Sequence, residues 1–248
     1  MLEINQFDKI IAANWKLNGS KEFINQYLGV LKSDKVVRSN ICNIICPPVA
    51  YLQNFSFLST LTSKPMYLGA QDCSNYDSGA YTGEVSASML LDNKCDFCIV
   101  GHSERRHIFN QTNEDVKIKA EKLINQGIIP IICIGESLEE KNKGSTKEVL
   151  RNQITNSLPN NSTIKTTILA YEPIWAIGTG SMPTLEEIVN IHSFLKEDIE
   201  NFQNYKIIYG GSVNSKNSKE IINSKNVDGV LIGGSSLKSE EFIKIIES

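Results

Sequence analysis

A carboxylate, an imidazole and an ammonium group each follow a short apolar run in this sequence. Glu172 lies in AYEPIWAIGTG, where it is either a catalytic base under a mobile loop or a solvated acid at a turn. His102 and Ser103 follow DFCIVG, and Asn14 and Lys16 end the first run. Taken singly, each has an ordinary structural explanation. Taken together, a base, an imidazole and a fixed cation suit proton transfer on an anionic substrate.

Two glycine-rich turns follow the last two apolar runs. YGGSV contains residues 210–212, and LIGGSSL contains Gly233 and Gly234. Glycine lets backbone N–H groups approach an anion closely, and a following helix adds its positive end. The two turns together therefore favour a phosphate monoester as the ligand.

Eight apolar runs predict the strands that position these residues. Their near-continuous hydrophobicity is typical of a parallel sheet covered on both faces. Helical segments lie between them, one beginning after Thr112 and ending near Gly127, another spanning 184–202 with Thr184 as its cap. The runs are KIIAANW, ICNIICP, MYLGA, DFCIVG, IIPIICIG, TTILAYE, KIIYGG and DGVLIGG.

The alternation predicts an α/β fold, either a (β/α)8 barrel or an open doubly wound sheet. The length of 248 residues matches the roughly 250 typical of the barrel. An open dinucleotide-binding sheet usually carries G-x-G-x-x-G after its first strand, and ANWKLNGS stands there instead. We therefore expect residues 1–248 to form a single barrel domain, with its chemistry at the carboxyl ends of the strands.

Composition favours small-molecule chemistry. A net charge of −3 gives no sign of a nucleic-acid or membrane surface. The sequence shows no secretory signal and no apolar segment near the ~20 residues of a membrane span, so we expect a cytoplasmic protein. The six cysteines include no C-x-x-C pair, which favours free, mostly buried thiols without zinc or disulfides, with Cys73 expected to be exposed.

The motifs together resemble the triosephosphate isomerase family over essentially the whole chain. They are NWK at 14–16, GHSERR at 101–106, CIGE at 133–136, AYEPIWAIGTG, YGGSV, and GG-S-SL at 233–237. The resemblance implies a TIM barrel isomerase of glycolysis and gluconeogenesis. Such an enzyme interconverts dihydroxyacetone phosphate and D-glyceraldehyde 3-phosphate through an enediolate, without a cofactor or a metal.

The resemblance also implies a role for each residue. Glu172 would be the base, His102 the electrophile, and Lys16 the cation that holds the phosphate, with Glu104 ordering the site beside it. This family is itself the standard example of a neutral imidazole whose pKa is lowered by a helix N-terminus. SERRHIF after His102 is able to begin such a helix. The implied substrate-binding residues are Asn14, Lys16, Gly178, Ser212, Gly233 and Gly234.

A lid loop is implied too, because an enediolate phosphate exposed to water eliminates phosphate. The implied lid residues are Pro173, Trp175, Ile177 and Gly178. Ile177 would clamp over the base together with Leu231. The second hinge, SMP at 181–183, departs from the commonest family pattern, and its proline should make the hinge stiffer.

GAQDCSNYDSGAYTGEVS resembles the family's long third loop, which inserts into a neighbouring subunit. The resemblance implies a homodimer with Gln71 and Thr82 at its interface, Thr82 reaching toward the Asn14 and Lys16 region of the other subunit. A loop packed on its own subunit is the alternative. NQT at 110–112, where an acid is common in the family, suggests altered hydrogen bonding away from the chemistry.

Two other functions suit a phosphate-binding barrel. A different sugar-phosphate isomerase or an aldolase-like lyase predicts a Schiff-base lysine inside a strand, and no run has a lysine in its interior. A barrel that only binds predicts loss of Glu172, His102 or Lys16, and all three are present. The sequence therefore favours the isomerase.

Overall fold

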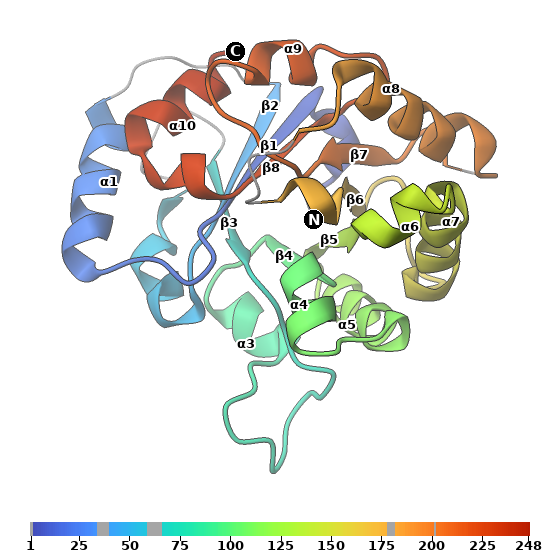
Figure 1. The fold of residues 1–248 in the computed structure, drawn as a ribbon. Coiled ribbons are helices and arrows are strands. Elements are labelled where there is room, and N and C mark those ends of the chain that lie inside the picture. The colour runs from blue at the N-terminus through green and yellow to red at the C-terminus, as the bar shows by residue number, and fades with distance from the viewer. Residues whose placement is uncertain (1, 34–39, 59–65, 178–181, 201) are drawn as a thin grey trace.

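Eight parallel strands close into a barrel, and helices surround it (Figure 1). The computed structural model describes residues 2–33, 40–58, 66–177, 182–200 and 202–248. The strands pair in sequence order, and β8 closes the barrel on β1 where Ile10 lies opposite Gly229. The predicted (β/α)8 barrel and its eight strands are confirmed. The strands are β1 (Lys9–Asn14), β2 (Ile41–Cys46), β3 (Met66–Ala70), β4 (Phe97–Val100), β5 (Ile129–Ile134), β6 (Ile168–Tyr171), β7 (Lys206–Tyr209) and β8 (Gly229–Ile232).

Each strand contributes to two apolar cores. In β1, Ile10 and Ala12 belong to the cluster inside the barrel, whereas Ile11 and Ala13 belong to the cluster between strands and helices. Successive side chains of a strand point to opposite faces, so both faces are buried here. This explains why the strand sequences are almost continuously hydrophobic.

Capping side chains set where two of the longer helices begin. Thr112 accepts the N–H of Asp115 at 3.1 Å, and Thr184 accepts the N–H of Glu187 at 3.1 Å. Each pair forms a capping box, which confirms both predicted helix starts. The helices are α1 (Lys21–Ser33), α3 (Ala87–Asp92), α4 (Ser103–Ile108), α5 (Asn113–Asn125), α6 (Leu138–Asn142), α7 (Thr146–Ser157), α8 (Leu185–Ser193), α9 (Ser218–Ile222) and α10 (Ser239–Ile246).

Short helical turns complete the described chain. They are η1 (Ile4–Gln6), η2 (Val49–Phe55), η3 (Ile174–Ala176), η4 (Phe194–Asp198) and η5 (Gly234–Leu237). The helix predicted to continue from Thr184 to residue 202 was too long, because α8 ends at Ser193 and η4 is a π-helical turn. In a π turn the backbone hydrogen bonds join residues that are five apart in sequence. Phe194 and Ile199 have this separation, and both are buried.

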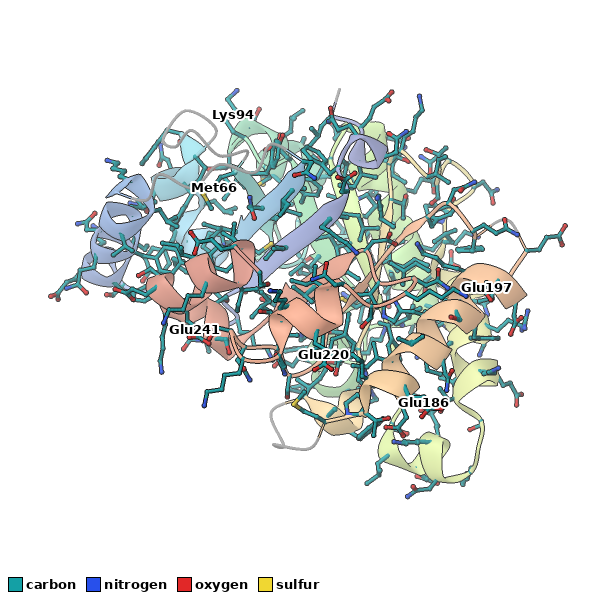
Figure 2. The ribbon with its side chains drawn as sticks, turned by 90° about the horizontal axis from the view of Figure 1, so that it is seen from above. Met66, Lys94, Glu186, Glu197, Glu220 and Glu241 are labelled. Carbon is teal, nitrogen blue, oxygen red and sulfur yellow. The ribbon has the colours of Figure 1, made fainter. Side chains whose placement is uncertain are left out.

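The outer helices carry charged side chains toward solvent. Figure 2 shows Glu186 on α8, Glu220 on α9 and Glu241 on α10 lying outside the strands. Among the described residues, no helix has the length and apolar content needed to cross a bilayer. Between β3 and α3, residues 71–86 form a long loop that projects away from the barrel (Figure 1).

The six cysteines are free and buried. The expectation that Cys73 is exposed was wrong, since only 5% of this residue is accessible. Although its surrounding segment is rich in polar and small residues, Cys73 lies just after β3 and joins Cys98 in the outer apolar core.

Candidate active site

The carboxyl ends of several strands surround one cavity of about 280 Å³. It collects every described residue that the sequence predicted to be catalytic or substrate-binding. Gly178 falls outside the described residues. Across the described ranges, no group of His, Cys, Asp and Glu side chains is arranged to hold a metal ion. The predicted residues lining the cavity are Asn14, Lys16, His102, Glu172, Ser212, Gly233 and Gly234.

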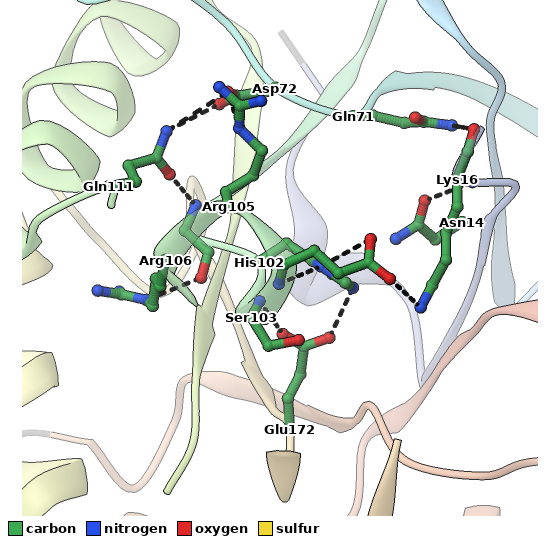
Figure 3. Close-up of polar contacts among 12 residues, drawn as sticks. Asn14, Lys16, Gln71, Asp72, His102, Ser103, Arg105, Arg106, Gln111 and Glu172 are labelled. Carbon is green, nitrogen blue, oxygen red and sulfur yellow. Dashed lines mark hydrogen bonds and ion pairs between the residues drawn. The ribbon is translucent and has the colours of Figure 1, made fainter. Parts of the chain in front are cut away.

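Glu172 follows β6 directly and is 2% exposed. Its Oε2 accepts the Ser103 N–H at 3.0 Å, and its Oε1 lies 3.0 Å from Nε2 of His102 (Figure 3). Burial raises the pKa of Glu172, but His102 and the Ser103 N–H stabilise the carboxylate more strongly, so the pKa lies below its usual value. The side chain is therefore a buried, ionised carboxylate.

Two glycines leave room for Glu172. A Cβ at Gly135 would lie 1.8 Å from the Glu172 carbonyl oxygen, and one at Gly210 would lie 2.8 Å from its Cγ. Both distances are too short for any larger residue without movement of the glutamate. The glycine turn after β7 thus packs against Glu172 as well as lining the cavity.

His102 is the N-cap of α4, so the short helix predicted after it is confirmed. Its Nδ1 accepts the Glu104 N–H at 3.2 Å, and we therefore assign the imidazole proton to Nε2. Burial lowers the pKa of His102, but the Glu172 and Glu104 carboxylates raise it more, and the balance lies above the usual value. This balance depends on Glu172 remaining 3.0 Å away.

Lys16 has a left-handed backbone, with φ of 52°. That conformation costs roughly 1–2 kcal/mol for a residue with a Cβ, and neighbouring groups hold it in place. Asn14 Oδ1 accepts the Lys16 N–H at 3.0 Å, and Gln71 donates to the Lys16 carbonyl at 2.9 Å (Figure 3). The Lys16 ammonium lies 2.6 Å from Glu104 Oε1. The turn thus holds a cation at the cavity wall.

The segment after Glu172 is anchored at its first residues. Trp175 Nε1 donates to Glu136 Oε1 at 2.8 Å, and the Tyr171 hydroxyl donates to the same oxygen at 3.2 Å. Ser212 Oγ donates to the Ala176 carbonyl at 2.9 Å. Glu136 ends the CIGE motif, and the sequence predicted no role for it. Its position directly after an apolar run was the same signal that identified Glu172.

Of the remaining predicted lid residues, some are described by the structure and others are not. Ile177 and Leu231, the pair predicted to clamp over Glu172, both line the cavity. Pro173 precedes η3. Residues 178–181, which include Gly178 and the first residue of the second hinge, lie outside the described residues.

Asn217 supports the turn after β7 and was missed in the sequence. Its Nδ2 donates to the Ser212 carbonyl at 3.1 Å and lies 3.6 Å from Met182 Sδ. Its Oδ1 accepts the Asn214 N–H at 2.8 Å. No sequence signal distinguished this asparagine from the many others in the chain.

Known proteins match this chain over nearly its full length. The family model for triosephosphate isomerase matches residues 9–248. A triosephosphate isomerase of Francisella tularensis subsp. mediasiatica is 42% identical over 245 residues, covering 96% of each chain. One of Hahella chejuensis is 40% identical, covering 97% of this chain and 98% of the other. The crystal structure of triosephosphate isomerase from Bartonella henselae superposes with a TM-score of 0.85 at 31% identity, covering 97% of this chain and 98% of that one.

Proposed function

The chain belongs to the triosephosphate isomerase family, and we propose that Glu172, His102 and Lys16 carry out the family's reaction at the barrel mouth. The protein is an aldose–ketose isomerase that interconverts dihydroxyacetone phosphate and D-glyceraldehyde 3-phosphate. One observation supports the assignment of these three residues to catalysis. An ionised, 2% exposed Glu172 lies 3.0 Å from an imidazole, in a cavity that Lys16 also lines.

Glu172 is the base that removes a proton from the carbon beside the substrate carbonyl. Both of its oxygens are engaged, one by the Ser103 N–H and one by His102. The carboxylate therefore leaves these partners to reach the substrate. Once the carboxylate has lost these hydrogen bonds and faces a C–H group in a site without water, its charged form is less stabilised. It is then a stronger base. It then returns the proton to the neighbouring carbon.

His102 hydrogen-bonds the substrate oxygen through Nε2–H and carries protons between the two oxygens of the enediolate. When Glu172 moves away, the strongest influence that raises the pKa of His102 is removed. Burial and the Lys16 ammonium, which both lower it, then weigh more heavily. The imidazole is accordingly neutral during the reaction, with Nδ1 held by the Glu104 N–H. Lys16 stabilises the negative charge on the intermediate.

The phosphate group lies at the two glycine turns. Ser212, Gly233 and Gly234 line the same cavity as the three catalytic side chains, and backbone N–H groups supply most of the donors. By its resemblance to the family's loop, Gly178, which lies outside the described residues, is a further proposed phosphate-binding residue. Closure over Ile177 and Leu231 excludes water and protects the enediolate phosphate from elimination.

We further propose that the enzyme is a cytoplasmic homodimer whose third loop inserts into the other subunit. The loop at 71–86 projects from the barrel (Figure 1), and Thr82 in this loop is exposed. In this chain Gln71, at the root of the loop, contacts the carbonyls of Lys16 and Cys46. The root of the loop thus contacts the active site of its own subunit, and the projecting part of the loop can contact a second subunit.

The decisive experiment is an isomerase assay on glyceraldehyde 3-phosphate with wild type and Glu172→Gln. The amide keeps the shape and can still accept the Ser103 N–H, but it is not a base, so kcat should fall by about 10²–10⁴. Glu139→Gln is the matched control, because that side chain is 77% exposed on α6, and its kcat should equal that of wild type. An inactive wild type, or an undiminished rate in Glu172→Gln, would overturn the assignment.

A further inference from the structure

Met182 is an exposed residue whose sulfur lies against Asn217, a residue that supports the turn carrying Ser212. The residue lies shortly before α8 and is 43% exposed. Its Sδ lies 3.6 Å from Asn217 Nδ2, and the same amide group donates to the Ser212 carbonyl at 3.1 Å. Asn217 also accepts the Asn214 N–H, so this one side chain connects the Met182 sulfur to two backbone groups of the turn after β7.

We propose that Met182 is a redox-sensitive site, where oxidation by a peroxide to methionine sulfoxide slows the isomerase. The thioether sulfur attacks one oxygen of the peroxide, and the O–O bond breaks. The sulfur gains that oxygen and loses two electrons, and hydrogen peroxide is reduced to water. Methionine sulfoxide reductases reverse the change.

The contact with Asn217 explains why oxidation affects turnover. A thioether is a weak acceptor, whereas a sulfoxide oxygen is strongly polar. The oxidised side chain would accept the Asn217 N–H more strongly and hold the segment before α8 against the phosphate-binding turn. This inference rests on the proposed function, because turnover slows only if that segment moves when the lid closes.

Most other sulfurs among the described residues are protected. Met66 is fully buried. Burial raises the pKa of five cysteine thiols, which keeps them protonated and slow to oxidise. Met89 on α3 is 49% exposed but does not line the cavity, so it provides a matched internal control. The five thiols are those of Cys42, Cys46, Cys95, Cys98 and Cys133.

The test treats purified wild type, Met182→Leu and Met89→Leu with hydrogen peroxide. Peptide mass spectrometry measures sulfoxide at each methionine, circular dichroism checks the fold, and kcat is measured with glyceraldehyde 3-phosphate. We expect kcat of wild type and Met89→Leu to fall severalfold in proportion to sulfoxide at Met182. Met182→Leu should keep its untreated kcat, and a methionine sulfoxide reductase should restore wild type.

Three results would overturn the inference. Met182 could resist oxidation, its complete oxidation could leave kcat unchanged, or Met182→Leu could lose activity as fast as wild type. In each case an untreated enzyme that is active leaves the proposed function standing. Absence of isomerase activity before peroxide is added would instead overturn the proposed function, and this inference with it.

Discussion

His192 is a buried imidazole outside the catalytic cavity. It lies on α8, is fully buried, and its Nδ1 lies 3.1 Å from the Asn226 carbonyl. Among the described residues, Nε2 has no hydrogen-bond partner. Burial lowers the pKa of His192 to about 4, although the Asn226 carbonyl opposes the shift. The folded protein therefore keeps this side chain neutral over a range in which the unfolded chain protonates it.

This difference predicts a loss of stability in acid. The folded pKa is depressed below the ordinary value of about 6.5, so the unfolded state binds more protons between about pH 6.5 and 4. The free energy of unfolding should fall across that window as pH decreases, by up to roughly 3 kcal/mol from this residue. Urea unfolding at a series of pH values and one protein concentration measures the slope.

The replacement His192→Gln should flatten that slope, because glutamine does not titrate and its amide can donate to the Asn226 carbonyl. His107→Gln, at an exposed position on α4, should keep the wild-type slope. If both variants retained the wild-type slope, His192 would not be the source of the acid sensitivity.

Residue types and their positions predicted which side chains line the cavity, but not their contacts. Glu172, His102 and Lys16 were identified because each follows an apolar run at the end of a strand. The Lys16 carbonyl accepts from Gln71, which is distant in sequence, and no local pattern singled out Asn217, which donates to the Ser212 carbonyl. The burial of Cys73 likewise depends on a strand 25 residues later along the chain, beyond the reach of local composition.

At the scale of elements, α6 connects the two flanks of the predicted lid. Lys141 Nζ lies 3.5 Å from the centre of the Trp175 ring and 3.0 Å from Glu187 Oε1. Trp175 is one of the predicted lid residues, and Glu187 closes the capping box that begins α8 after the predicted second hinge. One ammonium group therefore stabilises both flanks in their described positions.

Removal of this ammonium should favour closure. The cation–π contact and the partly exposed ion pair together contribute about 1 kcal/mol. If Lys141→Met loses that stabilisation, the closed state gains up to about fivefold in population, and inorganic phosphate should inhibit competitively with a severalfold lower inhibition constant. Steady-state inhibition assays at constant ionic strength measure the change.

Lys143→Met, at the C-cap of the same helix, is the matched control. Its ammonium pairs with Glu139 at 2.6 Å and touches neither flank, so its inhibition constant should be that of wild type. Equal inhibition constants for Lys141→Met and wild type would contradict a role for α6 in holding the lid flanks.

Strands and helix starts were predicted correctly where a local sequence pattern determines them. Continuous hydrophobicity identified the strands, because both faces of each strand are covered. Capping residues identified the starts of α5 and α8. The π turn at η4 was not predictable, since the burial of Phe194 and Ile199 against the rest of the barrel determines it.

At the scale of the whole molecule, an apolar groove lies beside the root of the projecting loop. Its volume is about 740 Å³. Four large apolar residues that line it are strongly exposed, from 56% for Val49 to 95% for Leu17. The loop at 71–86 has an aromatic tip, with Tyr76 and Tyr81 stacked at 3.6 Å between ring centroids. The four residues are Leu17, Val49, Ile108 and Phe109.

An apolar groove and a projecting aromatic tip on the same chain suit a two-fold dimer, in which each copy inserts its loop into the other. A charge in the groove should disrupt this association, because an unpaired carboxylate would lose its hydration on burial. We expect Ile108→Asp to be monomeric by sedimentation equilibrium at micromolar concentration, with kcat reduced at least tenfold because Thr82 no longer reaches the other site.

Leu138→Asp is the matched control, because Leu138 is 54% exposed on α6 and does not line the groove. It should remain dimeric and fully active. A dimer that survives Ile108→Asp would place the subunit contact elsewhere on the barrel. A monomeric variant with wild-type kcat would show instead that each barrel completes its own active site, so that the loop serves association and not catalysis.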